Sequence, residues 1–247
     1  MGSSTSKNRQ PRLSSERLSM ATENYLLSIF RLEEQGTRVT LTQLAEHLKT
    51  LPVAEGLGTA LPSVGGMIRR MGREGLVETN QSKGVVLTRQ GRKSAESIVR
   101  RHRLAERMVV DLLDVELQDS HVEAHRLEHA ISPALERKIV ARLGNPTTCP
   151  FGHAIPGSGY SPPKNSMSLD EADPGPELVI DRIPEDDQLL LEYLVENDFI
   201  PGETISVIEA ARARGVITVL VNDNKVAFNY EVAAKIWVCP RGDWEDR

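Results

Sequence analysis

The stretch His121–His129, which reads His-Val-Glu-Ala-His-Arg-Leu-Glu-His, constrains this chain more than any other. On a helix, His121, His125, Glu128 and His129 would fall within roughly 100° of one another, because each residue turns the helix by about 100°. Four of the chain's six histidines lie between residues 102 and 129. Three imidazoles and a carboxylate on one helix face are typical ligands of a divalent metal ion. The leading hypothesis is therefore a metal-binding helix, and the alternative is a polar, solvated face.

Composition narrows the class of protein. A chain of 247 residues is long enough for one large domain or for two to three small ones. Its two cysteines, Cys149 and Cys239, give no disulfide framework, which suits a reducing cytosol. No apolar run approaches the ~20 residues that cross a bilayer, and the N-terminus lacks the apolar core of a signal peptide. We therefore expect a cytoplasmic protein without a membrane partner.

The charge is unevenly distributed along the chain. Residues 1–110 carry 18 Lys and Arg against 10 Asp and Glu, whereas the rest of the chain carries 12 against 25. A basic first part and an acidic second part favour a nucleic-acid-binding module joined to other modules. The alternative is a solvated surface without a partner.

Residues 1–19 are rich in Ser, Lys, Arg and Gln without an apolar period, which predicts a disordered basic leader. Residues 20–90 then show the order helix, helix, turn, helix, hairpin. The expected helices run from a cap at Thr22 to Gly36, from Leu41 (cap Thr40) to Leu48, and from Pro62 through Met71, before a hairpin that turns at 81–84. This order is typical of a winged helix-turn-helix, whose third helix enters the major groove of DNA.

The third helix and the hairpin supply the residues that we expect to contact DNA. They are Pro62, Ser63, Gly65 and Gly66 near the start of the helix, then Arg69 and Arg70, and Lys83 of the hairpin. Each of the two glycines costs a helix roughly 1 kcal/mol against Ala. The reason is either close approach of the backbone to DNA or close helix–helix packing, and the sequence leaves both open. The segment 49–61 exceeds the usual turn of ~3–4 residues, which predicts a loop, with contact to DNA or a partner as the alternative.

Residues 91–156 form a predicted helical domain. A long helix reaches about Leu113, and His102 and Glu106 share one of its faces because they are four residues apart. Asp119 or Ser120 is the expected cap of the next helix, and Pro133 starts another. Helices of this length without a sheet pack against one another or against a second subunit.

The segment Cys149-Pro150-Phe151-Gly152-His153 lies in a predicted loop. Its Cys and His give only weak support for a metal pair or a redox thiol, because a single pair is weak evidence. Residues 157–175, which are rich in Pro, Gly and Ser, predict a linker. Residues 176–240 read as short strands around a helix at Glu185–Asn197, which fits a small five-stranded barrel without a catalytic constellation.

Several of these motifs resemble one family, the metal-dependent repressors that include the diphtheria toxin repressor, the iron-dependent regulators and the manganese transport regulators. The resemblance covers nearly all of the chain after the leader. Its most specific parts are His102-Arg103-Leu104-Ala105-Glu106-Arg107, His121–His129 and Cys149-Pro150-Phe151-Gly152-His153-Ala154-Ile155-Pro156. It implies a mainly α protein with a small β domain: an N-terminal winged helix-turn-helix, a helical dimerisation domain and a C-terminal SH3-like, FeoA-like β-barrel.

The resemblance also implies two metal sites per subunit. The ancillary site would use His102, Glu106 and His121, completed by Glu185 and Gln188 of the last domain. The primary site would use His125, Glu128, His129 and a residue of the first helix. That residue is Asn24 here, where iron-type relatives have Met and manganese-type relatives Asp, and Glu23 beside it is the other candidate.

The ligand types bear on the metal. Iron-type relatives have Cys at the position of His125, so imidazole and amide here replace two sulfur ligands. Harder nitrogen and oxygen ligands favour Mn(II), and Fe(II) is also compatible. We therefore expect an Mn(II)- or Fe(II)-activated transcriptional repressor of metal-homeostasis genes, binding a palindromic operator as a homodimer and acting on no small-molecule substrate.

Two other classes of function compete with this interpretation. A helical metalloenzyme, either a hydrolase or a di-metal oxidase, would explain the histidines, but neither His-Glu-x-x-His nor Glu-x-x-His occurs in the chain. An adaptor that binds peptides through its barrel would explain the last domain but not the basic first part.

Overall fold

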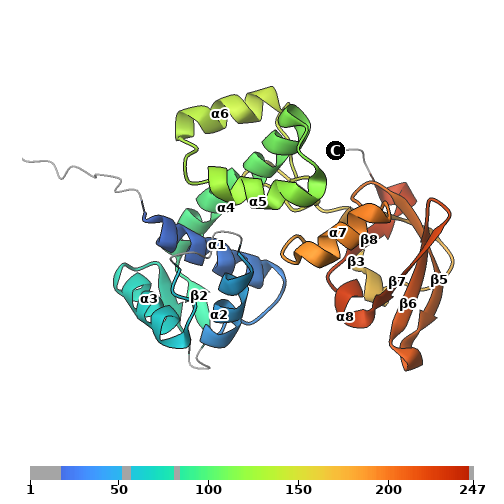
Figure 1. Ribbon diagram of the computed structural model, residues 1–247, viewed down its shortest axis with the longest axis horizontal. Coiled ribbons are helices and arrows are strands. Elements are labelled where there is room, and N and C mark those ends of the chain that lie inside the picture. Colours follow the sequence, from blue (N-terminus) through green and yellow to red (C-terminus); the bar gives the residue numbers. More distant parts are fainter. Residues whose placement is uncertain (1–17, 52–56, 81–83, 245–247) are drawn as a thin grey trace, which may run out of the picture.

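The computed structural model describes residues 18–51, 57–80 and 84–244. Three helices and a short hairpin form the first layer: α1 (Met20–Glu34), α2 (Leu41–Thr50), α3 (Leu61–Arg73), β1 (Val77–Thr79) and β2 (Val85–Leu87), with the two strands antiparallel. These elements enclose one apolar core, which includes Leu26, Leu44 and Val64. Figure 1 shows α3 at the outer edge of this unit, where it packs against α2. The winged helix-turn-helix expected from the sequence is therefore present.

The helix starts follow local capping chemistry. The α1 helix begins earlier than predicted, because Ser19 and not Thr22 is its N-cap and accepts a hydrogen bond from the Thr22 amide. Thr40 caps α2 as expected, and Gln43 completes a capping box with it. The predicted leader, apart from residues 18 and 19, lies outside the described residues, as do part of the 49–61 loop and the hairpin turn at 81–83.

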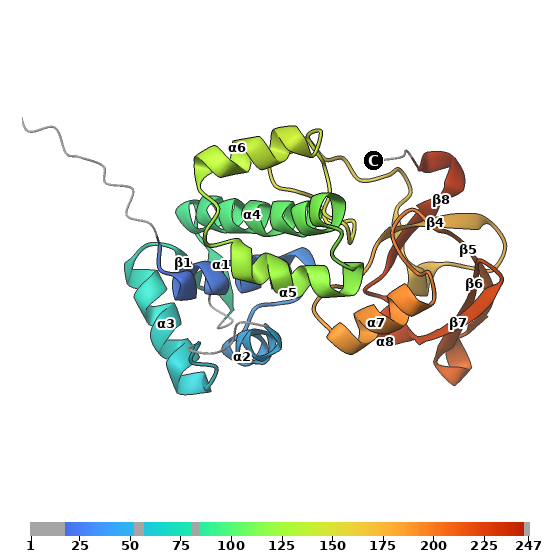
Figure 2. The same ribbon diagram turned by 45° about the horizontal axis from the view of Figure 1, so that its top comes forward.

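The helical domain consists of α4 (Arg89–Leu113), α5 (Leu117–Leu127) and α6 (Pro133–Arg142). The long α4 starts at Arg89, two residues before the predicted start of the helical domain, with Thr88 as N-cap. Gly91 is required there, since a Cβ on it would lie 1.8 Å from the carbonyl oxygen of Leu76. The α4 helix packs against α1 and α5, and α6 lies along its opposite side (Figure 2).

The α5 helix departs from the prediction at both of its ends. It starts at Leu117 after Glu116, so neither Asp119 nor Ser120 is its cap. It ends at Leu127, and Glu128 and His129 lie in the turn that follows. Both residues remain buried, because the turn folds toward α1 rather than into solvent.

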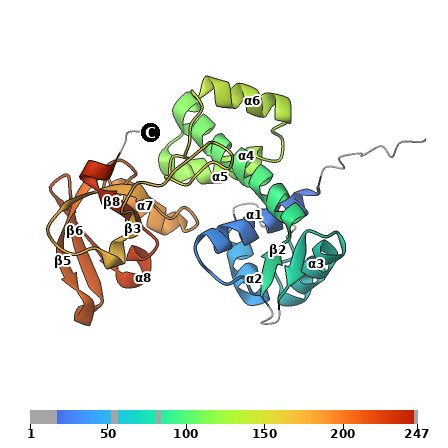
Figure 3. The same cartoon turned by 180° about the vertical axis from the view of Figure 1, so that it is seen from behind.

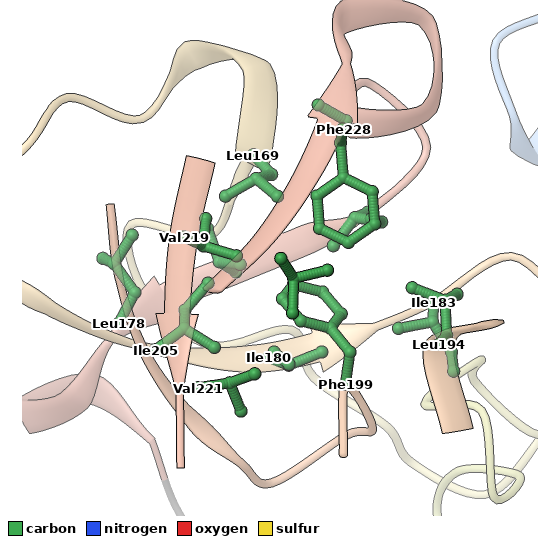
Figure 4. Packing of buried hydrophobic residues seen from close by; sticks show 14 of the residues in the cluster. Leu169, Leu178, Ile180, Ile183, Leu194, Phe199, Ile205, Val219, Val221 and Phe228 are labelled. Atoms are coloured by element: carbon green, nitrogen blue, oxygen red, sulfur yellow. The ribbon is translucent and has the colours of Figure 1, made fainter. Parts of the chain in front are cut away.

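The C-terminal domain is a six-stranded antiparallel sheet with strand order β3-β8-β4-β5-β6-β7. Its elements are β3 (Met167–Ser168), η1 (Leu169–Glu171), β4 (Glu177–Arg182), α7 (Gln188–Glu196), β5 (Thr204–Ala211), η2 (Arg212–Arg214), β6 (Val216–Val221), β7 (Asn224–Asn229), α8 (Tyr230–Ala233), β8 (Trp237–Pro240) and η3 (Arg241–Asp243). The strands curve around a core of aliphatic and aromatic side chains (Figure 4). The SH3-like domain is therefore present, with one strand more than expected.

That extra strand lies inside the predicted linker. Met167 and Ser168 pair with β8, and Leu169 and Ala172 are buried in the core of the sheet domain. The strand could not be predicted from the Pro-, Gly- and Ser-rich sequence of residues 157–175, because two residues are too few to show a hydrophobic period. Only the part before β3 connects the domains without regular structure.

The loop around residues 149–153 joins the helical domain to the sheet domain. Phe151 is buried in the sheet's core, and its carbonyl oxygen accepts a hydrogen bond from the Ile183 amide. Gly152 has φ +87°, and a Cβ on it would lie 2.0 Å from the Asp181 carbonyl oxygen. This close approach places the segment before α7 next to α1 and α5 (Figure 3). No helix in the described part of the chain could span a membrane.

Candidate metal centre

Side chains from α1 and from the end of α5 meet at the predicted primary site. The Nε2 atom of His129 lies 3.0 Å from Asn24 Oδ1 and 3.2 Å from Glu128 Oε1. The Nδ1 atom of His125 lies 3.3 Å from the same Glu128 oxygen. All four side chains are buried, although they come from residues up to 105 positions apart. The structure therefore places the four residues that the resemblance implied for this site in one chain of contacts, from Asn24 through His129 and Glu128 to His125.

Glu23 lies on the outer side of His129. One carboxylate oxygen of Glu23 is 2.6 Å from His129 Nδ1, the nitrogen that faces away from Asn24, and the other accepts a hydrogen bond from Arg101. Burial raises the pKa of Glu23, but His129 and Arg101 lower it below its ordinary value. A carboxylate that binds the far nitrogen of a metal-ligating imidazole orients the ring and raises its basicity. The geometry thus gives Asn24 the inner position and Glu23 the outer one.

The predicted ancillary residues form a second cluster. His102 Nε2 lies 2.8 Å from Glu106 Oε1 and 3.2 Å from His121 Nδ1, and that nitrogen of His121 is 3.0 Å from the same Glu106 oxygen. One atom each of His102, Glu106, His121 and Glu185 lies within 4.8 Å of the others. The cluster spans α4, α5 and the segment before α7.

The two clusters touch each other through His102. Its Nδ1 atom is 2.6 Å from Glu128 Oε2, and its ring centroid is 4.4 Å from that of His125. His121 lies 4.7 Å from His125 between ring centroids, slightly farther than His102. The three rings therefore form one buried group that links the ancillary and the primary site, and one nitrogen of each lies within 4.8 Å of the others.

Burial and charge give these histidines different protonation. Burial lowers the pKa of His102, but Glu106 and Glu128 raise it to about 10. Burial lowers the pKa of His125 to about 3, against the smaller opposite effect of Glu128. The same contacts hold the pKa of Glu106 and of Glu128 well below the ordinary range, although burial alone raises both. His125 is thus neutral and able to bind a metal, whereas His102 carries a proton.

The donor atoms fit a divalent cation. Glu106 Oε2 and His125 Nε2 are buried and have no hydrogen-bond partner among the described residues. Such atoms are costly to bury unless something binds them. The ligands are imidazole nitrogens and carboxylate or amide oxygens, which bind Mn(II), Fe(II) and Zn(II).

Two features of the ancillary site differ from the expectation. Gln188 is exposed and lines a cavity with His121 and Glu185, but its amide nitrogen donates to the Gln118 carbonyl oxygen and to Glu192. Arg31, which sequence reasoning missed, is buried beside Glu185 and forms an ion pair with it. A polar residue at helical spacing from Asn24 is the signal that could have drawn attention to Arg31.

The Cys149–His153 segment lies next to Glu185. The Cys149 thiol donates to Glu185 Oε2 over 3.8 Å, and His153 Nε2 is 3.8 Å from the same oxygen. Burial, followed by the charges of Glu106 and Glu185, raises the pKa of Cys149 well above its ordinary value. A buried thiol that keeps its proton is a poor nucleophile, which argues against a redox role.

The predicted DNA-contacting residues lie on α3, apart from Lys83, which is outside the described residues. Pro62 occupies the first turn, and Ser63, Arg69 and Arg70 are exposed. Arg70 forms a hydrogen bond to Glu74, four residues on, which fixes its side chain near the end of the helix.

Close packing does not explain the glycine pair. A Cβ on Gly65 would lie 3.4 Å from Arg69 Nη1, the mobile end of a long side chain, and 3.8 Å from Leu41 Cδ1. A Cβ on Gly66 would meet only Arg69 Nη2, at 3.9 Å. Within the described residues, neither glycine is therefore needed for helix–helix contact.

The fold and the site define a class: a winged helix-turn-helix protein whose DNA-reading domain meets a helical domain at buried groups of the kind that bind divalent metals. Three family models match consecutive segments of this chain. They describe the N-terminal DNA-binding domain of iron-dependent repressors at residues 17–85, their metal-binding and dimerisation domain at 88–157, and the FeoA domain at 167–240.

Similar proteins agree with these matches. The iron-dependent repressor IdeR of Mycobacterium leprae is 32% identical over 230 residues, which cover 88% of this chain and 96% of that protein. The diphtheria toxin repressor of Corynebacterium glutamicum is 36% identical over 62% of this chain and 60% of its own length. A manganese-dependent transcriptional repressor solved in complex with manganese superposes with TM-score 0.77 at 29% identity, covering 89% of this chain and 99% of that one.

This chain belongs to the family of metal-dependent transcriptional repressors that includes IdeR and the diphtheria toxin repressor. The family comprises repressors, which are not enzymes, and the comparisons support neither the metalloenzyme nor the peptide-binding adaptor.

Proposed function

We propose that this protein is a cytoplasmic repressor that binds a palindromic DNA operator as a homodimer when it holds Mn(II), with Fe(II) also compatible. In this proposal, residues 20–90 read DNA, 91–156 dimerise and hold the metal, and 176–240 modulate the junction between them. The regulated genes would be those of metal homeostasis.

One observation carries the proposal. Asn24 belongs to the DNA-reading domain, whereas His125, Glu128 and His129 belong to the helical domain, and all four lie within hydrogen-bond distance of a neighbour in the set. An ion bound by both groups would fix α1 against α5. In a homodimer, this would fix the distance between the two α3 helices, which must match half-sites about 34 Å apart.

Each residue has a distinct task in this arrangement. Glu128 supplies the negative charge of the primary site, and the neutral His125 supplies a nitrogen that needs no deprotonation. Glu23 holds His129 from outside, and Arg101 holds Glu23. Asn24 already lies within hydrogen-bond distance of His129, and a bound metal would add a link from Asn24 to His125 and Glu128 of the helical domain. By linkage, metal and operator each raise the affinity for the other by the same factor.

The ligand set supports the preference for Mn(II). It contains no sulfur: the described thiol nearest to it, Cys149, is held by Glu185 and keeps its proton. Imidazole, amide and carboxylate form a harder set than one with thiolate or thioether, and harder ligands suit Mn(II). Relatives solved with manganese and, in the case of ScaR, with Cd2+ are in line with a divalent ion.

The experiment compares operator binding by the full-length protein with Mn(II) and after chelation. We expect tight binding only with the metal. Glu128→Gln should lose this activation, whereas Glu123→Gln, on the exposed side of the preceding helix α5 where Glu123 pairs with Arg126, should keep it. Equal affinity with and without Mn(II) would refute the proposal.

A further inference from the structure

Arg31 occupies the place where the ancillary site approaches the C-terminal domain. Its side chain is 4% exposed. The Nη2 atom forms an ion pair with Glu185 and lies 3.0 Å from Asp186 Oδ1, while Nη1 lies 3.5 Å from His121 Nε2. A permanent cation from α1 is therefore already in contact with two members of the ancillary cluster, His121 and Glu185.

Both carboxylate oxygens of Glu185 already contact protein groups. Oε1 accepts from Arg31, and Oε2 is contacted by the Cys149 thiol and by His153, each at 3.8 Å. Glu106 is different, because its Oε2 atom has no partner among the described residues. Of the two carboxylates in the cluster, the one from the C-terminal domain is thus fully engaged by the protein.

A divalent ion at this position would have to compete with Arg31. Taking Glu185 as a ligand would deprive the buried guanidinium of one of its two carboxylate partners, Glu185 and Asp186, and breaking a buried ion pair is destabilising in proteins. The ion would also lie close to that positive charge, since it would bind His121, whose Nε2 atom faces Arg31. Gln188, the other expected ligand, is exposed, and its amide nitrogen already donates to Gln118 and Glu192.

We propose that Arg31 takes the place of the ancillary metal ion, so that this chain holds one divalent ion tightly per subunit, at Asn24, His125, Glu128 and His129. This inference rests on the proposed function and replaces the two sites per subunit that the sequence led us to expect. Arg31 binds Glu185 and Asp186 whether or not metal is present. The C-terminal domain therefore stays fastened to α1 in the metal-free protein, with help from Gln35, whose amide donates to Asp186 over 3.1 Å.

The test is the number of Mn(II) ions bound per subunit of the full-length protein, measured by equilibrium dialysis and by the electron paramagnetic resonance signal of free Mn(II). Arg31→Met removes the charge at similar length, and its thioether is a soft donor that Mn(II) does not favour. Arg31→Lys keeps the charge. Arg92→Met is the matched control, because Arg92 pairs with Glu33 of the same helix but on its exposed side.

We expect one tightly bound ion in the unaltered protein, in Arg31→Lys and in Arg92→Met, and two in Arg31→Met. Two tight ions in the unaltered protein, or one in a folded Arg31→Met variant, would overturn the inference while leaving the proposed function intact. A protein that binds no Mn(II) at all would instead defeat the proposed function, and the inference with it.

A second variant keeps the inference testable if Arg31→Met does not fold. Glu185→Gln should leave the single tight ion in place, because Glu185 is not one of its ligands, and loss of that ion would overturn the inference. Small-angle X-ray scattering in the presence of chelator gives an independent readout. The unaltered protein should keep its radius of gyration when metal is removed, whereas Glu185→Gln should expand, and an equal expansion of both would contradict the fastening role of Arg31.

Discussion

Replacing Gly66 by Ala separates the two explanations of the glycine pair in α3. Glycine in a helix interior is about 1 kcal/mol less favourable than Ala. The full gain is available at this position, because the added methyl group would touch nothing nearer than Arg69 Nη2 at 3.9 Å. For a chain of this size, that gain corresponds to a rise in melting temperature of about 2–4 °C. On DNA the same methyl group would stand between the helix and the groove, and a loss of ~1.4 kcal/mol would weaken operator binding about tenfold.

Differential scanning calorimetry and a fluorescence anisotropy titration with operator DNA, both with Mn(II), measure the two effects on one sample. Gly72→Ala is the control, since it lies in the same helix, its methyl group would lie 3.8 Å from the Val77 carbonyl oxygen, and it is two turns from the groove-reading end. It should stabilise the protein without weakening operator binding. If Gly66→Ala raises the melting temperature and leaves operator affinity unchanged, close approach to DNA is not why the glycine is there.

Three further predictions follow from the junction and the surface. Glu23→Gln should weaken Mn(II) binding about 10- to 100-fold, because the carboxylate of Glu23 orients the imidazole ring of His129. Glu33→Gln on the same helix should leave Mn(II) binding unchanged, and isothermal titration calorimetry measures both affinities. In the presence of chelator, the free energy of unfolding should be highest near pH 6.5. The pKa of His102 is raised to about 10 in the folded protein, so its stabilising contribution is lost as the pH rises from 6.5 toward 10. The pKa of His125 is lowered to about 3, so this histidine destabilises the folded protein as the pH falls below 6.5. Urea titrations from pH 5 to 9 that give a flat profile would contradict this. Leu113→Glu should weaken dimerisation roughly 30-fold in sedimentation velocity, since Leu113 is 60% exposed at the end of α4 and burying a leucine contributes roughly 2 kcal/mol.

The order of elements was predictable because it depends on local signals. Thr40 with Gln43, Pro133 after Ser132, and the apolar period of α1 each depend on residues a few positions apart. The errors arose where the signal is not local. β3 is too short to have a period and exists because Met167 and Ser168 pair with β8, some 70 residues later.

Much of the primary site could also be predicted from the sequence, since three of its residues fall within His125–His129. Spacing alone could not decide between Glu23 and Asn24, because the two residues are adjacent. The structure distinguishes them, since Glu23 contacts Nδ1 of His129 and Asn24 contacts Nε2. Helical spacing from Asn24 could have drawn attention to Arg31, but not to its ion pair. Its partner Glu185 is 154 residues away, in a segment whose position depends on the close approach of Gly152 to β4.

The buried polar face of α1 explains how one metal ion per subunit can fix the direction of this helix. Asn24, Ser28 and Arg31 recur at helical spacing and are all buried, so the helix presents one polar face to the junction. Asn24 and Arg31 are seven residues apart, or about 10 Å along the axis. A single contact leaves a helix free to pivot, whereas contacts at both ends of a face fix its direction. Arg31 provides one of the two contacts permanently, through Glu185 and Asp186. The ion at Asn24 then needs to provide only the second, and the position of α3 depends on one binding event per subunit.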